Sequence, residues 1–157
     1  PGTGGDIEAA WHCVDVVARE KLYLSFLEGP PLGESRKFWN GLIEKGYPFE
    51  VAVDGERVVG WCDITPIARP VLSHIGVLGM GLLPSHREAG IGRRLLATTL
   101  EQARACGLER VELHVFSANV RARRLYESLG FAVEGVMPRR VKIDGQYQDE
   151  IMMAVTL

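Results

Sequence analysis

The stretch REAGIGRRLL, which runs from Arg87 to Leu96, places Gly90 and Gly92 one residue apart where a helix is expected to begin. Apolar residues then recur at helical spacing on one face: Ile91, Leu95, Leu96, Leu100 and Ala103. Glycine costs a helix about 1 kcal/mol relative to alanine, so a pair of glycines in the first turn needs a reason. Either the chain turns tightly here from a strand into the helix, or the missing side chains let an anion approach the N–H groups of the helix start.

Length and composition indicate one folded domain. The chain has 157 residues, of which 46% are hydrophobic and 24% are charged. We expect residues 1–5 to form a flexible leader and residues 6–157 to form a single domain with a sizeable core. The net charge of −2 argues against a nucleic-acid partner, because such proteins carry a basic excess. No apolar run approaches the roughly 20 residues of a membrane span, so we expect no membrane association.

The cysteines and histidines of the sequence indicate the cellular compartment and whether a metal site is expected. The three cysteines, Cys13, Cys62 and Cys106, are widely separated and odd in number, which favours unpaired thiols in a reducing compartment. We therefore expect a cytoplasmic protein. The four histidines lie at positions 12, 74, 86 and 114, without the spacing of metal ligands, so no metal site is predicted.

The order of predicted elements indicates an α/β or α+β architecture, with helices covering a mainly antiparallel sheet. Helices are expected over 6–27, capped by Asp6, then over 34–44, from the quoted stretch to Gly107, and over 119–129. Strands are expected over 49–53, 57–64, 74–83, 110–116, 131–136, 141–143 and 147–155. Asp-Gly pairs at 54–55 and 144–145 predict two hairpin turns.

The strand predicted over 74–83 contains three glycines, at positions 76, 79 and 81. Glycine inside a strand weakens it and often marks a bulge or the close approach of another backbone or a ligand. A bulge would splay the strand from its neighbour and leave N–H and C=O groups that an extended, amide-containing ligand could pair. The alternative is a crowded position in the sheet.

A second segment, over residues 119–131, helps to interpret the glycine pair at positions 90 and 92. Neither the dinucleotide pattern G-x-G-x-x-G nor a phosphate loop ending in GK[ST] is present around residues 87–92. The stretch NVRARRLYESLGF runs from Asn119 to Phe131, after the next predicted strand. Taken together, the two segments resemble the GNAT superfamily of acetyl-CoA-dependent N-acetyltransferases. That family carries Q/R-x-x-G-x-G/A after a bulged strand, and N-x-x-A-x-x-L-Y-x-x-x-G-F about thirty residues later.

The resemblance implies the GNAT fold, a mixed and mainly antiparallel sheet with a splayed, bulged strand, flanked by about four helices. It is specific from about His74 to Phe131, and the family's first strand has little counterpart before Asp6, so that strand either lies upstream of Pro1 or is replaced by the leader.

The resemblance also implies that acetyl-CoA is the co-substrate, and it implies which residues bind it. Backbone amides would hold the pyrophosphate of the coenzyme, at Arg87, Glu88, Ala89, Gly90, Ile91, Gly92 and Arg93. Backbone groups of Leu82 and Leu83 would pair with the pantetheine arm. Asn119 would contact that arm or position the last helix.

Tyr126 would bind the cofactor and act as the general acid that protonates the departing thiolate. Its position supports this role independently, because Ala122, Leu125, Tyr126 and Leu129 share one helical face and the phenol should point inward. A buried tyrosine that serves only the core is the alternative. A backbone N–H near Gly81 or Leu82 would stabilise the charge that develops on the thioester oxygen.

The general base is less well defined. Strand alternation places Glu112, His114 and Phe116 on one face, and an imidazole with a pKa near 6.5 suits a base. A histidine that merely sits on a half-buried strand is the alternative. His74, Asp63 and an ordered water remain open as other bases.

The expected reaction is direct transfer of acetyl to a primary amine, of an amino acid or amine-like small molecule or of a protein N-terminus. The tail over 141–152 resembles that of family subgroups with such acceptors. Cys62 or Cys106 as an acyl carrier is the rival mechanism, although neither has a setting that activates a thiol. A catalytically silent coenzyme A sensor and a structural interaction protein are the rival functions. A homodimer is compatible with the sequence, which does not identify the acceptor.

Overall fold

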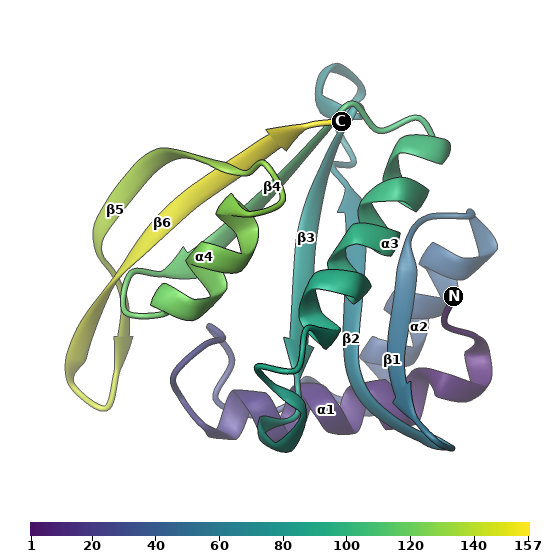
Figure 1. Cartoon of the computed structure of the whole chain (residues 1–157), viewed down its shortest axis with the longest axis horizontal. Helices are drawn as coiled ribbons and strands as arrows, with labels where there is room; N and C mark the ends of the chain where they lie inside the picture. The colour runs from purple at the N-terminus through teal and green to yellow at the C-terminus, as the bar shows by residue number, and fades with distance from the viewer.

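A computed structural model describes all residues from 1 to 157 as six strands and four α-helices (Figure 1). The elements are α1 (Ile7–Arg19), α2 (Leu32–Glu44), β1 (Phe49–Asp54), β2 (Arg57–Pro66), β3 (Ile75–Leu82), α3 (Ile91–Ala105), β4 (Arg110–Phe116), α4 (Val120–Glu127), β5 (Ala132–Ile143) and β6 (Gln146–Thr156). The strands form one sheet in the order β1-β2-β3-β4-β6-β5, and only the β3–β4 pair is parallel. The predicted mixed, mainly antiparallel sheet with about four helices is therefore confirmed.

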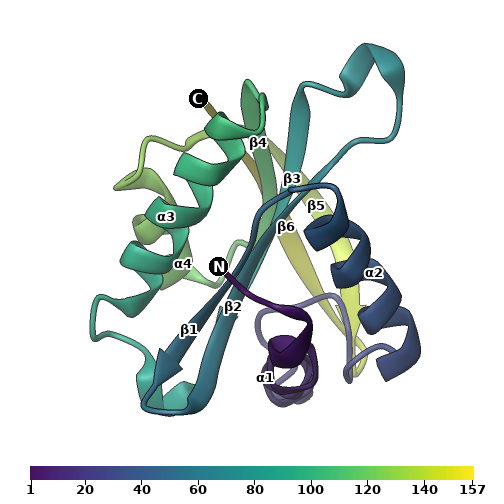
Figure 2. The ribbon, with the colours of Figure 1, turned by 90° about the vertical axis from the view of Figure 1, so that its right-hand side faces the viewer.

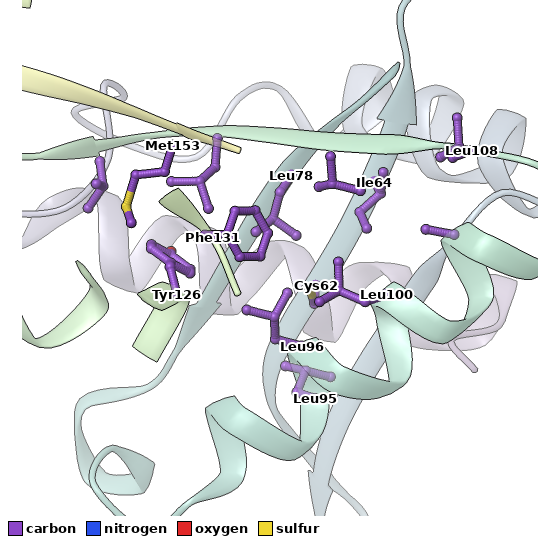
Figure 3. Packing of buried hydrophobic residues seen from close by; sticks show 14 of the residues in the cluster. Cys62, Ile64, Leu78, Leu95, Leu96, Leu100, Leu108, Tyr126, Phe131 and Met153 are labelled. Carbon is purple, nitrogen blue, oxygen red and sulfur yellow. The ribbon is translucent and has the colours of Figure 1, made fainter. Parts of the chain in front are cut away.

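The sheet separates two layers of helices, with α1 and α2 on one face and α3 and α4 on the other (Figure 2). Because alternate residues of a strand point to opposite faces, β2 contributes to two cores. Cys62 and Ile64 pack into a 15-residue cluster under α3 and α4, part of which is drawn in Figure 3. Val59 and Trp61 pack into a 12-residue cluster under α1 and α2. No helix combines the length and apolar composition that crossing a membrane requires.

The centre of the sheet is split between β3 and β4. The two strands pair only over 75–77 on β3, opposite 110–112 on β4, and then diverge. By contrast, β3 keeps one register with β2 from Gly76 to Leu82. The irregularity that three glycines predicted therefore takes the form of a divergence from β4 and not of a register shift against β2. Beyond residue 77, the β4-facing backbone groups of β3 have no strand opposite them.

Two of the three β3 glycines are required by close packing. A Cβ on Gly76 would lie 2.3 Å from Ile64, and a Cβ on Gly81 would lie 2.5 Å from the Trp61 ring. These positions match the crowded-sheet interpretation. A Cβ on Gly79 would come no closer than 3.5 Å to any other residue, the nearest atom being an oxygen of Asp63. Packing therefore does not demand a glycine at position 79.

Gly81→Ala is expected to destabilise the fold by about 1–3 kcal/mol, because the new methyl group overpacks the buried Trp61 ring. Gly79→Ala, on the same strand, adds a methyl group at ordinary contact distance and should change stability little. Urea denaturation of both variants measures the difference. Equal stability of the two proteins would show that the Trp61 ring moves aside without cost.

The first helix is shorter than expected and is not capped as expected. It ends at Arg19 and not near residue 27, because the chain turns back along it, where Trp11 Nε1 donates to Pro30 O (2.6 Å) and Gly29 N–H donates to Asp15 (2.8 Å). Asp6 makes no side-chain bond to α1; its carboxylate accepts instead from the N–H and hydroxyl of Thr3. The segment expected to be a flexible leader lies against β1, where Gly2 N–H donates to Phe49 O (2.7 Å).

The strands predicted over 131–136 and 141–143 form one strand, β5, in the structure. The interruption that suggested two strands is a register shift against β6 between Met137 and Val141, which contains Pro138. An edge strand accommodates a proline because its missing N–H faces no partner. β5 is such an edge strand, and it forms a long hairpin with β6 that extends past the rest of the sheet (Figure 1).

Candidate active site

A pocket of about 320 Å³ lies at the split between β3 and β4. It is lined from both faces of the sheet, since Gly79 and Gly81 border it as well as Leu78, Met80 and Leu82. Most of the predicted site residues line it: Leu82, Arg87, Glu88, Gly90, Gly92, Arg93, His114, Asn119 and Tyr126. Leu83, Ala89 and Ile91 do not. The tertiary structure thus gathers residues that the sequence spreads over more than forty positions.

The glycine pair builds the open start of α3. Gly90 is the N-cap residue in the left-handed conformation, with φ of 74°, and no atom lies within 4 Å of the place where its Cβ would be. The first intrahelical bond runs from Arg94 N–H to Gly90 O, so the N–H groups of residues 91–93 have no partner within the helix. No side chain caps them. These N–H groups and the helix dipole favour an anion at this end of the pocket.

The backbone of β3 offers hydrogen bonds to the split at alternate residues. Leu83 N–H donates to Val59 O (2.8 Å), and an antiparallel ladder alternates, so Gly81 and Gly79 also direct their backbone groups toward β2. Met80 and Leu82 direct theirs toward the split. Of the two positions considered for the backbone donor, Gly81 directs its N–H toward β2 and Leu82 directs its N–H toward the split, as does Met80 two residues earlier.

Leu83 does not offer its backbone to the pocket, contrary to the sequence-based expectation. Its N–H is bound to Val59, and its C=O accepts from His86 N–H (3.0 Å). Sequence alone could not separate Leu82 from Leu83, because the phase of the ladder depends on which strand lies on each side of β3. Leu82 N–H remains the group of the pair that faces the split.

Arg87 uses its side chain to anchor the segment between α1 and α2. Its guanidinium donates to Glu20 (Nη1 to Oε2, 2.9 Å) and, through Nε, to Leu82 O (3.0 Å), and it lies 4.9 Å from the centre of the Tyr23 ring. Tyr23 and Leu24 border the pocket. Arg87 therefore holds this segment at the pocket mouth. Its own backbone N–H, predicted to hold the pyrophosphate, donates instead to Pro84 O (3.4 Å).

Asn119 and Tyr126 belong to the other wall of the pocket. Asn119 is the N-cap of α4, where its side chain accepts from Ala122 N–H (3.2 Å), so of its two predicted roles the structure contains the positioning one. Tyr126 is 8% exposed and packs against Phe131, with ring centres 5.8 Å apart (Figure 3). Burial raises the pKa of the Tyr126 phenol, so it stays protonated and can donate at neutral pH.

His114 lies on the opposite face of the sheet from Tyr126. It alternates with the buried Leu113 along β4, borders the pocket and is 47% exposed. Its Nδ1 lies 3.7 Å from Glu150 Oε2, which is beyond hydrogen-bond distance. His74, the other histidine considered as a base, precedes β3 at the closed end of the split, where its C=O accepts from Glu109 N–H (2.9 Å), and it does not border the pocket.

Asp63 is more prominent in the structure than in the sequence, where it is one of several alternative bases. It is 7% exposed, and its Oδ2 accepts from Trp39 Nε1 (3.1 Å). Burial raises the pKa of its carboxyl to about 7, and the bond from Trp39 opposes that rise. The available sequence signal was an acidic residue within an apolar strand, Val58 to Ile64, where a buried charge is costly unless it has a purpose.

The cysteines lack the setting of an acyl carrier. Cys62 is fully buried in the core under α3, and burial raises the pKa of its thiol. Cys106 is half-buried at the C-terminal end of α3, where its thiol donates to Ala103 O. Neither borders the pocket. No three His, Cys, Asp or Glu side chains gather in a group that could hold a metal ion.

Comparisons with known proteins agree with this geometry. Residues 17–131 match the Acetyltransferase (GNAT) family. The uncharacterized N-acetyltransferase YdgE of Bacillus subtilis is 36% identical over 121 residues, which are 77% of this chain and 71% of YdgE. The L-methionine sulfoximine/L-methionine sulfone acetyltransferase of Salmonella typhimurium is 35% identical over 74 residues, 47% of this chain. That match spans only 43% of the relative's length.

The fold is also that of solved acetyltransferases. The structure of yncA from Salmonella typhimurium, which contains its cofactor acetyl-CoA, superposes with a TM-score of 0.94. The superposition covers 99% of this chain and 91% of yncA, and the two sequences are 22% identical. At that identity the likeness establishes the shared fold.

Proposed function

This chain belongs to the Acetyltransferase (GNAT) family, and from that premise we propose that it transfers an acetyl group from acetyl-CoA to a primary amine. The acceptor would be an amino acid or a related small amine, or a peptide N-terminus. The observation that carries the proposal is the split between β3 and β4, which joins an anion cradle at the start of α3 to a pocket open to both faces of the sheet.

The residues present fit acetyl-CoA. Diphosphate requires N–H donors and room for its oxygens, and the start of α3 supplies both at Gly90. Pantetheine carries amides that require donors and acceptors, and the backbone of Met80 and the N–H of Leu82 face the split. When bound, the coenzyme supplies an acetyl thioester with a good leaving group.

The two faces of the sheet would then take part in different steps of the reaction. The acceptor nitrogen adds to the thioester carbon from the side of α1 and α2, while the N–H of Met80 or Leu82 donates to the carbonyl oxygen. The C–S bond breaks on the side of α3 and α4. There the Tyr126 phenol, kept protonated by burial, donates its proton to the departing sulfur.

An amino acid or a similar amine is the favoured acceptor class. Support comes from the Salmonella relative, which is an acetyltransferase of L-methionine sulfoximine and L-methionine sulfone. Carboxyl groups of Asp63, Glu112 and Glu150 lie on the strand face that carries His114, and such a face suits an ammonium group. A coenzyme A sensor without turnover is the second candidate, since it would use the same cradle.

Calorimetric titration with acetyl-CoA is the first test, and we expect saturable one-to-one binding. A panel of amino acids, including methionine sulfoximine, and short peptides is then assayed by release of the free thiol. Turnover with an amine supports the enzyme. Saturable binding without turnover across the panel would favour the sensor, and a folded protein that binds no acetyl-CoA would contradict both.

A further inference from the structure

One buried carboxyl group lies beside the pocket without a role in coenzyme binding. Asp63 is on β2, on the face shared with Val59 and Trp61, toward α1 and α2. Its only hydrogen-bond donor is the indole of Trp39 on α2, at 3.1 Å from Oδ2. A carboxylate accepts several hydrogen bonds, so Asp63 retains accepting capacity on Oδ1.

Gly79 opens the path from the pocket to this carboxyl group. The two residues are paired across the β2–β3 ladder, and a Cβ on Gly79 would lie 3.5 Å from Oδ1 and 3.7 Å from Oδ2 of Asp63. Asp63 does not itself line the pocket, but its cross-strand partner Gly79 does, and Gly79 has no side chain to cover the carboxyl group on that side. A side chain at position 79 would cover the carboxyl group without any clash, so the glycine serves access and not packing.

The surroundings leave Asp63 able to exist in both protonation states near neutral pH. No cation pairs with it: α1 contributes the neutral thiol of Cys13, whose pKa burial raises to about 11, and β1 contributes Phe49. The buried residues of α2 are Ser35, Trp39 and Leu42, of which none ionises. Across the split, β4 carries Glu112 and His114. Burial raises the pKa of Asp63 to about 7, which is the range in which a general base works best.

We propose that Asp63 is the general base, which takes a proton from the acceptor's ammonium group on the face of the sheet opposite Tyr126. This inference rests on the proposed acetyl transfer. The ammonium loses one proton to the Asp63 carboxylate, and the free amine forms the C–N bond with the acetyl carbon. As the C–S bond breaks, the sulfur takes the Tyr126 proton, and the phenol recovers the second nitrogen proton through solvent. Asp63 then releases its proton to solvent.

His114 is the competing base, and its setting differs in a way that the test can use. It is 47% exposed and lies on β4, on the far side of the split, with Glu150 at 3.7 Å. Asp63 is almost fully withdrawn from water and has no ionic partner. A base shielded from solvent keeps the proton it has taken near the reacting nitrogen, whereas an exposed imidazole exchanges with bulk water.

The test compares pH profiles of kcat/KM for the amine in three variants. In the wild-type protein, activity should rise with pH through about 7, because the ionised Asp63 is the active form. Asp63→Asn keeps an oxygen for Trp39 and should lower kcat at least about 100-fold, with loss of this rise. His114→Gln should keep the rise. The matched control is Glu50→Gln. Glu50 is also a buried carboxyl group, but it lies on the opposite face of the sheet, where it accepts a hydrogen bond from Gln102.

The stability of Asp63→Asn and its affinity for acetyl-CoA distinguish a failure of the Asp63 assignment from a failure of the proposed acetyl transfer. Ionisation of a buried Asp63 costs stability, which declines as pH rises from about 4 through 7, so Asp63→Asn should be at least as stable as wild type at pH 8. It should also bind acetyl-CoA within about twofold of wild type. Gly79→Ala, which covers Oδ1, should lower kcat/KM for the amine in a folded protein.

Two results would overturn the assignment while leaving acetyl transfer intact. One is an Asp63→Asn variant with wild-type kcat and an unchanged pH profile. The other is loss of the pH-dependent rise in His114→Gln alone, which would make His114 the base. A wild-type protein that neither binds acetyl-CoA nor turns over any amine would instead remove the proposed function, and Asp63 as base with it.

Discussion

Gly90→Val is expected to abolish acetyl-CoA binding, with an increase in Kd of at least about 100-fold, equivalent to about 2.7 kcal/mol. A Cβ on Gly90 would project into space where nothing lies within 4 Å. This space is next to the N–H groups of the first turn of α3. A branched side chain would therefore fill the volume in which we propose that the diphosphate binds. The measurement is calorimetric titration with acetyl-CoA, next to the wild-type protein.

The matched control for this variant stands at the other end of the same helix. Gly107 has φ of 89°, and its Cβ would also meet nothing within 4 Å, but it does not border the pocket. Valine in the left-handed region costs about 1–2 kcal/mol of strain at either position. Gly107→Val should therefore lose similar stability and keep its affinity. If both variants lost affinity alike, helix strain and not the filled cradle would be responsible.

Tyr126→Phe is expected to lower kcat by about 10-fold to 100-fold while leaving acetyl-CoA affinity near that of wild type. The upper part of the general-acid range is not expected, because a thiolate with a pKa near 8.5 leaves with modest help. The ring stays in place against Phe131, since only the hydroxyl is removed. Thiol release measures kcat, and calorimetry measures affinity.

Stability provides an internal check on the Tyr126 variant. Tyr126 packs in the core under α4 and borders the pocket, and burial of the phenol, not a hydrogen bond, dominates its pKa. Loss of the hydroxyl should therefore leave the free energy of unfolding almost unchanged. Tyr147→Phe removes an exposed hydroxyl on β6 and should affect neither quantity. Wild-type kcat in Tyr126→Phe would show that solvent protonates the thiolate.

The sequence by itself determined the elements whose signals are local. Alternating and β-branched residues defined β4 at Arg110–Phe116, and the glycine pair defined the start of α3. Gly107 adopts the positive φ that ends α3, as its position predicted. Tyr126 faces inward because helical periodicity sets which residues share a face. Each of these features depends on neighbours within one or two turns of chain.

Only the tertiary structure decided which backbone groups and which carboxyl group serve the site. The difference between Leu82 and Leu83 follows from the pairing of β3 with β2, and the place of Asp63 next to the pocket follows from its pairing with Gly79, which lines the pocket. These relations join residues sixteen or more positions apart through sheet register. A pattern read along one strand does not specify register, because the partner strand and the direction of pairing are set by the packing of both helix layers.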